Sequence, residues 1–202
     1  MRLLVGCEFS GVVRDAFIAR GVDAVSCDLE PSETPGPHIQ ADLFEVIDAG
    51  GWDMLIFFWP CTHMAVSGSQ WFKGKLLRQA RDVACFRLLM ECGIPRVVGE
   101  NPIGRLSTLY RKPDQIIQPH QFGHPQFKAT CLWLKGVQKL KPTNQLALPA
   151  RGTDEWKRWN GTHREPPGPN RAKNRSRTFL GIGEAMADQY TALLGQEWSL
   201  TA

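Results

Sequence analysis

Residues 52–68 read WDMLIFFWPCTHMAVSG, and this stretch indicates the fold class. Its apolar run, Leu55 to Phe58, is short and is followed at once by Pro60, which is typical of a buried strand and not of a helix. Open α/β sheets place their chemistry just beyond the carboxyl ends of such strands. Cys61 stands at that position, so it is the first candidate for a reactive residue.

The composition predicts a single domain that spans residues 1–202. A chain of 202 residues is long enough to build a substantial hydrophobic core. No early apolar segment has the flanks of a signal peptide, and no stretch reaches the length of a membrane span. The six cysteines are scattered without a CxxC pair. This pattern favours free thiols in a reduced, cytoplasmic setting over a disulfide or zinc framework.

Positive charge is concentrated in residues 151–177, which hold eight basic and three acidic residues, although the whole chain has a formal charge of only +4. The surrounding stretch, from about residue 136 to 177, has little periodicity and many prolines and tryptophans. We therefore expect an irregular basic insertion there. Such a charge cluster suggests a polyanionic partner or a phosphate-bearing substrate, and a solvated basic loop is the alternative.

Strand and helix patterns alternate along the chain, which predicts an α/β fold with one sheet flanked by helices. The expected strands are 2–6, 22–27, 55–58, 96–99 and 131–133. The expected helices are 11–18, 43–49, 75–92 and 179–194. Residues 30–37 and 65–74 are predicted to be loops, and the second could close over a substrate.

Polar residues follow several of these strands. The turn CEFSG, residues 7–11, leads into a helix N-terminus and would present backbone N–H groups to a ligand, or be an ordinary turn. Asp28 ends the second strand, where an acid commonly binds ribose hydroxyls; a solvated loop acid is the alternative. Glu100 and Asn101 follow the strand at 96–99, and we expect them in the same cleft as Cys61. His120 and His124 lie in a proline-flanked loop, so no metal site is assigned to them.

These elements together resemble the C5-cytosine-specific DNA methyltransferases. The resemblance rests on CEFSG (7–11), WPC (59–61), ENP (100–102), FGHPQFKATCLWL (122–134) and GIGEAMADQYTALLG (181–195), in the family's order over most of the chain. It implies a Rossmann-like class I methyltransferase fold, S-adenosyl-L-methionine as cofactor and DNA as partner, with no metal and no membrane.

The chemistry of that family explains why these residue types occur together. Carbon 5 of cytosine is a poor nucleophile until a thiolate adds to carbon 6, and a carboxyl group at ring N3 stabilises the charge that develops. The resemblance implies that Cys61 is the nucleophile and that Glu100 contacts N3. Implied cofactor contacts are Phe9, Ser10, Gly11, Asp28, Asp42, Leu43, Pro60 and Gly183. Implied substrate contacts are Asn101, which would brace the cleft loop, Lys128, Thr130, Arg175 and Arg177.

The sequence also departs from the family. Lys128 and Thr130 stand in the element where the family has two arginines, and Thr62 replaces a glutamine. The basic insertion stands in place of a target-recognition domain, which suggests a compact member of phage or mobile-element origin. Trp156 and Trp159 in that insertion could stack bases. Two alternatives stay open: methylation of a free cytosine nucleotide such as dCMP, and a non-catalytic nucleic-acid-binding protein.

Overall fold

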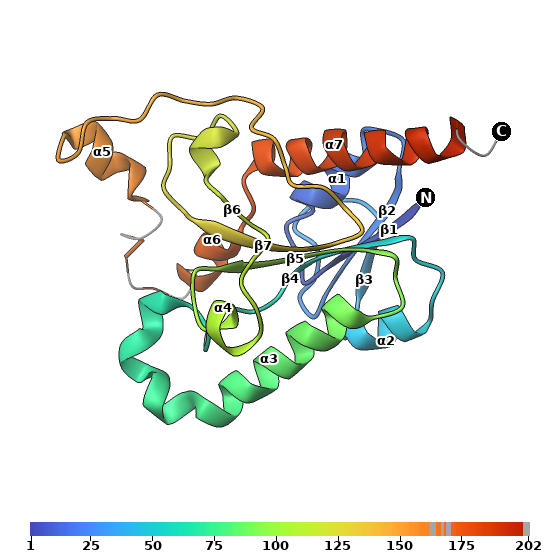
Figure 1. The fold of residues 1–202 in the computed structure, drawn as a ribbon, viewed down its shortest axis with the longest axis horizontal. Helices are drawn as coiled ribbons and strands as arrows, with labels where there is room; N and C mark the ends of the chain where they lie inside the picture. The colour runs from blue at the N-terminus through green and yellow to red at the C-terminus, as the bar shows by residue number, and fades with distance from the viewer. Residues whose placement is uncertain (162–164, 167, 169–170, 200–202) are drawn as a thin grey trace.

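A seven-stranded sheet lies at the centre of the computed structural model, which describes residues 1–161, 165–166, 168 and 171–199 (Figure 1). The strand order is β3-β2-β1-β4-β5-β7-β6, and β7 runs antiparallel to both of its neighbours. The strands are β1 (Arg2–Gly6), β2 (Asp23–Asp28), β3 (His38–Gln40), β4 (Met54–Phe58), β5 (Arg96–Pro102), β6 (Gln115–Ile117) and β7 (Thr130–Lys135). This mostly parallel sheet with flanking helices confirms the predicted α/β class.

Helices cover both faces of the sheet (Figure 1). They are α1 (Val12–Ile18), α2 (Leu43–Asp48), α3 (Leu76–Glu91), α4 (Leu106–Leu109), α5 (Asp154–Trp159), α6 (Arg171–Ser176) and α7 (Leu180–Ser199), with 3-10 helices η1 (Val66–Lys75) and η2 (Pro119–Gln121). α1 and α7 pack together on one face, and α2 and α3 lie on the other. Among the described residues, no helix is long and apolar enough to cross a bilayer.

Strand β4 is apolar throughout because both of its faces are buried. Met54 and Ile56 belong to the core under α1 and α7, whereas Leu55 and Phe57 belong to the core under α2 and α3. Successive side chains of a strand point to opposite faces, so a strand between two helical layers needs apolar residues at every position. This confirms the strand that the sequence predicts before Cys61.

Several predicted boundaries are wrong. β5 continues to Pro102 because β7 pairs with it as far as Pro102 and Thr130, so Glu100 and Asn101 lie inside the strand and not after it. Residues 65–74, predicted as a loop, mostly form η1. The strands β3 and β6 and the helices α5 and α6 were not predicted, because segments of three to six residues are too short to show a periodicity.

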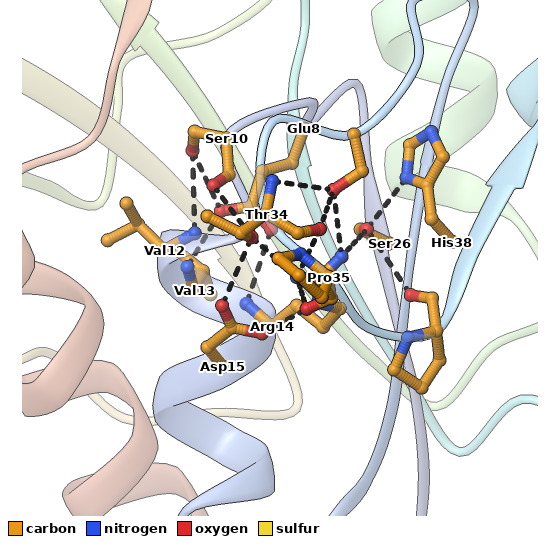
Figure 2. A network of polar contacts seen from close by, with 12 residues as sticks. Glu8, Ser10, Val12, Val13, Arg14, Asp15, Ser26, Thr34, Pro35 and His38 are labelled. Atoms are coloured by element: carbon orange, nitrogen blue, oxygen red, sulfur yellow. Dashed lines mark hydrogen bonds and ion pairs between the residues drawn. The ribbon is translucent and has the colours of Figure 1, made fainter.

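Arg14 on α1 is fully buried and holds the predicted loop 30–37 against this helix (Figure 2). Its guanidinium donates hydrogen bonds to Ser26, Ser32, Thr34 and Pro35, and its Nε lies 2.8 Å from Asp15. Buried polar groups are stable when they are fully hydrogen-bonded. The irregular loop therefore has a defined position beside the turn that follows β1.

The buried carboxylate of Glu8 caps α1 (Figure 2). It accepts hydrogen bonds from the backbone N–H groups of Val13, at 2.7 Å, and Arg14, at 3.2 Å. Burial raises the pKa of Glu8, and these two hydrogen bonds oppose that rise. The helix N-terminus that the sequence offers to a ligand is thus satisfied from within the chain.

His124 positions the start of α7. Its Nε2 accepts a hydrogen bond from the backbone N–H of Gly181 at 2.9 Å, and its ring centroid lies 5.2 Å from that of Phe179. His120 instead contacts Gln145 and the ring of Trp159. The two histidines therefore have separate packing roles, and the described residues contain no group of three His, Cys, Asp or Glu side chains that could hold a metal.

Replacing Arg14 with methionine should lower the free energy of unfolding by about 3 kcal/mol, because several buried acceptors lose their donor. The matched control is Arg87→Met, since the side chains of Arg87 and its partner Glu91 are 62% and 52% exposed. That exposed pair should contribute less than about 1 kcal/mol. Chemical denaturation measures both losses, and equal losses would contradict a structural role for the Arg14 network.

The contact at His124 should make stability depend on pH. Burial lowers the pKa of His124 in the folded protein, so the unfolded chain binds this proton more tightly. The stabilisation is complete above about pH 6.5, the pKa of a histidine in the unfolded chain, and it is lost as the pH falls below that value. We expect the free energy of unfolding, measured by denaturant titration, to fall less in His124→Gln than in the wild type when the pH is lowered from 8 to 5.5. An unchanged pH dependence in His124→Gln would show that His124 does not contribute.

Candidate active site

Cys61 lies in a tight turn just beyond the carboxyl end of β4. Its carbonyl accepts hydrogen bonds from the backbone N–H groups of Met64 and Ala65, both at 3.0 Å. The turn is fixed to α3 because His63 Nδ1 lies 2.9 Å from Asp82 and Gln79 Nε2 donates to the His63 carbonyl at 2.9 Å. The residue Cys61 is exposed, although neighbouring side chains partly desolvate its thiol.

Asn101 joins the end of β5 to the segment that carries Cys61. Its side chain is fully buried, and its Nδ2 donates a hydrogen bond of 2.7 Å to the carbonyl of Trp59. Within the described part of the chain its Oδ1 has no hydrogen-bond partner. The geometry thus gives Asn101 the bracing position that the sequence predicts.

Glu100 and Lys128 share the electrostatic environment of Cys61. Burial raises the pKa of Glu100, and the nearby ammonium of Lys128 opposes that rise. Burial lowers the pKa of Lys128, which Glu100 and Cys61 counteract. Burial, followed by the charge of Glu100, raises the pKa of the Cys61 thiol, whereas Lys128 and Arg175 lower it. The structure therefore brings together four residues that are far apart in the sequence.

Lys128 is held by its own neighbours in the chain and by the segment after α6. Its Nζ donates to the carbonyl of Arg177 at 3.1 Å and lies 5.6 Å from the ring centroid of Phe179. Thr130 is buried, and its hydroxyl donates to the Lys128 carbonyl at 3.0 Å. Thr130 thus supports the backbone of Lys128 while it also lines a small cavity beside Glu100.

Two adjoining cavities meet at Lys128, Thr178 and Phe179. The larger, of about 320 Å³, is lined by Gln126, Lys128, Gly161, Glu165, Asn174, Arg175, Arg177, Thr178 and Phe179. The smaller, of about 20 Å³, contains Glu100 and is closed on one side by Ser176 and Thr178. It has room for about one water molecule. This space is too small for a pyrimidine ring, so the residues that line it would have to move to admit one.

The predicted cofactor residues divide into two groups, and one lies at the edge formed by β1 and β2. The pKa of Cys7 is raised by burial and then by the carboxylates of Asp28 and Asp42, which places these residues close together. Cys7 has a φ of 55° and is the one residue other than glycine with a positive φ in the described part of the chain. Such backbone strain is characteristic of functional sites. Phe9 is half-buried beside this edge, and Pro60 is exposed.

The other group makes internal contacts. Leu43 is buried against Gly6, where an added Cβ would lie 2.6 Å from the Leu43 side chain. Gly183 packs against Val12 on α1, and a Cβ on Gly11 would meet Thr34 at 2.2 Å. The Ser10 hydroxyl bonds to Glu8. The neighbours of these four residues are parts of the chain itself, and their contact with the cofactor stays a prediction.

Glu33 connects the loop 30–37 to the segment of α6, and no pattern in the sequence marks it. Its carboxylate lies 2.9 Å from the Lys173 ammonium and 2.8 Å from Arg177 Nη2, and these cations lower its pKa. Its backbone N–H donates to the Phe9 carbonyl at 2.8 Å, and Lys173 Nζ lies 4.9 Å from the Phe9 ring centroid. A single acid in a proline-rich loop has no distinguishing pattern, so only the tertiary structure identifies this link.

The two tryptophans of the basic insertion differ in burial. Trp159 is only 5% exposed and packs with Phe127 at a centroid distance of 5.3 Å. Trp156 is half-buried and lies 6.2 Å from the same ring. The suggestion that they stack bases is therefore wrong for Trp159, which anchors α5 to the domain. Arg164, one of the eight basic residues, lies outside the described residues.

Replacing Glu33 with glutamine should release α6 without unfolding the protein. The Glu33 pairs are partly exposed, so the loss in global stability should be below about 1 kcal/mol. Hydrogen exchange of residues 171–177 should nevertheless become faster, because local opening needs little free energy. Glu30→Gln is the matched control, since Glu30 is an exposed acid in the same loop. Equal exchange in the two variants would show that Glu33 does not hold α6.

Comparisons with known proteins gave one kind of match. No family model and no curated protein matches the chain. Among solved structures, the chain is similar to a protein reported as a candidate DNA modification methyltransferase encoded within a prophage (E. coli), with a TM-score of 0.45 and 15% sequence identity. The alignment covers 72% of this chain and 52% of that one. The chain thus spans about half the length of the structure that it matches.

Proposed function

We propose that the protein transfers a methyl group from S-adenosyl-L-methionine to carbon 5 of a cytosine in DNA, with Cys61 as nucleophile. The observation that carries this proposal is the position of Cys61 beside Glu100, Lys128 and Arg175 at the carboxyl edge of β4 and β5. A thiol, a carboxyl that retains its proton and nearby cations are the groups that addition to a pyrimidine ring requires.

Glu100 would act first, as a hydrogen-bond donor to ring N3. Because burial raises its pKa, the carboxyl keeps its proton to a higher pH than an exposed glutamate does. A protonated Glu100 also removes the negative charge that raises the pKa of Cys61. Binding of the base would therefore favour the thiolate, since Lys128 and Arg175 remain as the charged neighbours of the sulfur.

The thiolate would then add to carbon 6 and form a carbon–sulfur bond. The electron pair of the 5,6 double bond moves to carbon 5, and proton donation from Glu100 to N3 stabilises the ring. After carbon 5 has received the methyl group, it loses its proton to a base. The double bond then re-forms as the carbon–sulfur bond breaks, which returns the electron pair to Cys61 and the proton on N3 to Glu100.

The residues at the edge of β1 and β2 suit the cofactor. Asp28 and Asp42 offer acceptors of the kind that bind ribose hydroxyls and an adenine amino group, and they lie together beside Cys7. Phe9 and Pro60 would be the other residues that contact the cofactor. When bound, S-adenosyl-L-methionine supplies a methyl group that is electrophilic because the sulfur that carries it is positively charged.

A second candidate substrate is a free cytosine nucleotide such as dCMP. The specific observation is that Lys128, Arg175 and Arg177 line a single cavity. In α5, by contrast, Lys157 is paired with Asp154. One enclosed group of cations fits one phosphate better than a run of phosphates.

Transfer of labelled methyl from S-adenosyl-L-methionine tests both candidates, with duplex DNA, single-stranded DNA and dCMP offered in parallel. We expect Cys61→Ala to abolish transfer and Glu100→Gln to reduce its rate at least about 100-fold. Cys85→Ala is the matched control, because Cys85 is a half-buried thiol on α3 and should leave transfer unchanged. Label in dCMP alone would favour the second candidate. Activity that survives in Cys61→Ala would exclude the covalent mechanism.

A further inference from the structure

The larger cavity is strongly cationic. Of its lining residues, Lys128, Arg175 and Arg177 carry positive charge, and Glu165 carries the one negative charge. The Glu165 carboxylate accepts a hydrogen bond of 2.7 Å from Asn174 Nδ2. A volume of about 320 Å³ is within the usual range for a small-molecule site. The cavity therefore suits a compact anion.

Arg175 lines this cavity, and its side chain also has a donor without a partner. Its Nε is buried and has no hydrogen-bond partner among the described residues. An unpaired buried donor is costly, so an acceptor supplied by a ligand would stabilise this arrangement. The planar guanidinium presents parallel N–H groups that match phosphate oxygens. Carboxylates and phosphates both match this geometry, and of the two a nucleotide carries phosphate.

The larger cavity adjoins the smaller cavity that contains Glu100. Lys128, Thr178 and Phe179 line both cavities, so a group in the larger one lies directly beside the pocket of Glu100. Arg177 is held from outside by Glu33 at 2.8 Å, and its carbonyl accepts from Lys128 Nζ. The cations thus have fixed positions next to the site proposed for the base.

We propose that this cavity binds one phosphate group of the nucleotide whose base meets Glu100, with Arg175 as the principal ligand. The phosphate is a monoester of a free nucleotide or a diester of a strand. This inference rests on the proposed function, because that function places the base at Glu100. It extends that function by assigning the phosphate to α6, a short helix that the sequence did not predict.

Binding measured without methyl transfer tests the site. Calorimetric titration of the wild type with deoxycytidine, dCMP and the trinucleotide TpCpT compares no phosphate, a monoester and diesters. We expect dCMP or TpCpT to bind at least about tenfold more tightly than deoxycytidine, as a charge-assisted hydrogen bond implies. In Arg175→Gln this advantage should disappear while the affinity for deoxycytidine changes little. Arg158→Gln, which alters an exposed arginine of α5, is the matched control and should bind as the wild type does.

These measurements distinguish a phosphate monoester from a diester. They also distinguish failure of the phosphate site from failure of the proposed methyl transfer. An Arg175-dependent advantage for dCMP identifies a monoester site, and one confined to TpCpT identifies a diester site. Equal affinity for all three ligands, or an advantage that Arg175→Gln retains, would overturn the phosphate site. Phosphate-dependent binding without methylation of any substrate would overturn the proposed reaction and leave this site intact. If Arg175→Gln methylates its substrate as the wild type does, the phosphate site would be overturned and the proposed reaction would stand.

Discussion

The parallel pairing of β4 with β5 is the constraint on which the candidate site depends. It sets Phe58 beside Glu100, so the segment that continues to Cys61 emerges next to the carboxyl group. The hydrogen bond from Asn101 to the Trp59 carbonyl then fixes the end of one strand to the first residue after the other. Because both strands are buried by helices on their two faces, this edge cannot shift without disturbing two cores.

Burial gives the ionisable groups at this edge their chemical character. In a poorly solvated pocket, the protonation of one group strongly changes the pKa of the next. Glu100 and Cys61 are both shifted toward their protonated forms, whereas Lys128 is shifted toward its neutral form. A substrate that neutralises Glu100 would leave the cations free to favour a thiolate.

The segment around α6 connects the two halves of the site. Glu33 holds Lys173 and Arg177 from the loop beside the cofactor edge, while Arg175 and Arg177 line the larger cavity. The same segment closes the space beside Glu100, which is too small for a pyrimidine ring. The cations proposed to bind the substrate therefore adjoin the residues that line the pocket of Glu100.

The sequence by itself determined the α/β class, the strand before Cys61 and the position of Asp28 at the end of a strand, because a run buried on both faces and a following proline are local signals. It also singled out Lys128, Arg175 and Arg177. The tertiary structure alone decided that Leu43 and Gly183 face the core, that Trp159 is buried and that Arg14 and Glu33 organise the loop 30–37. These outcomes depend on contacts between residues far apart in the chain, and no local periodicity records such contacts.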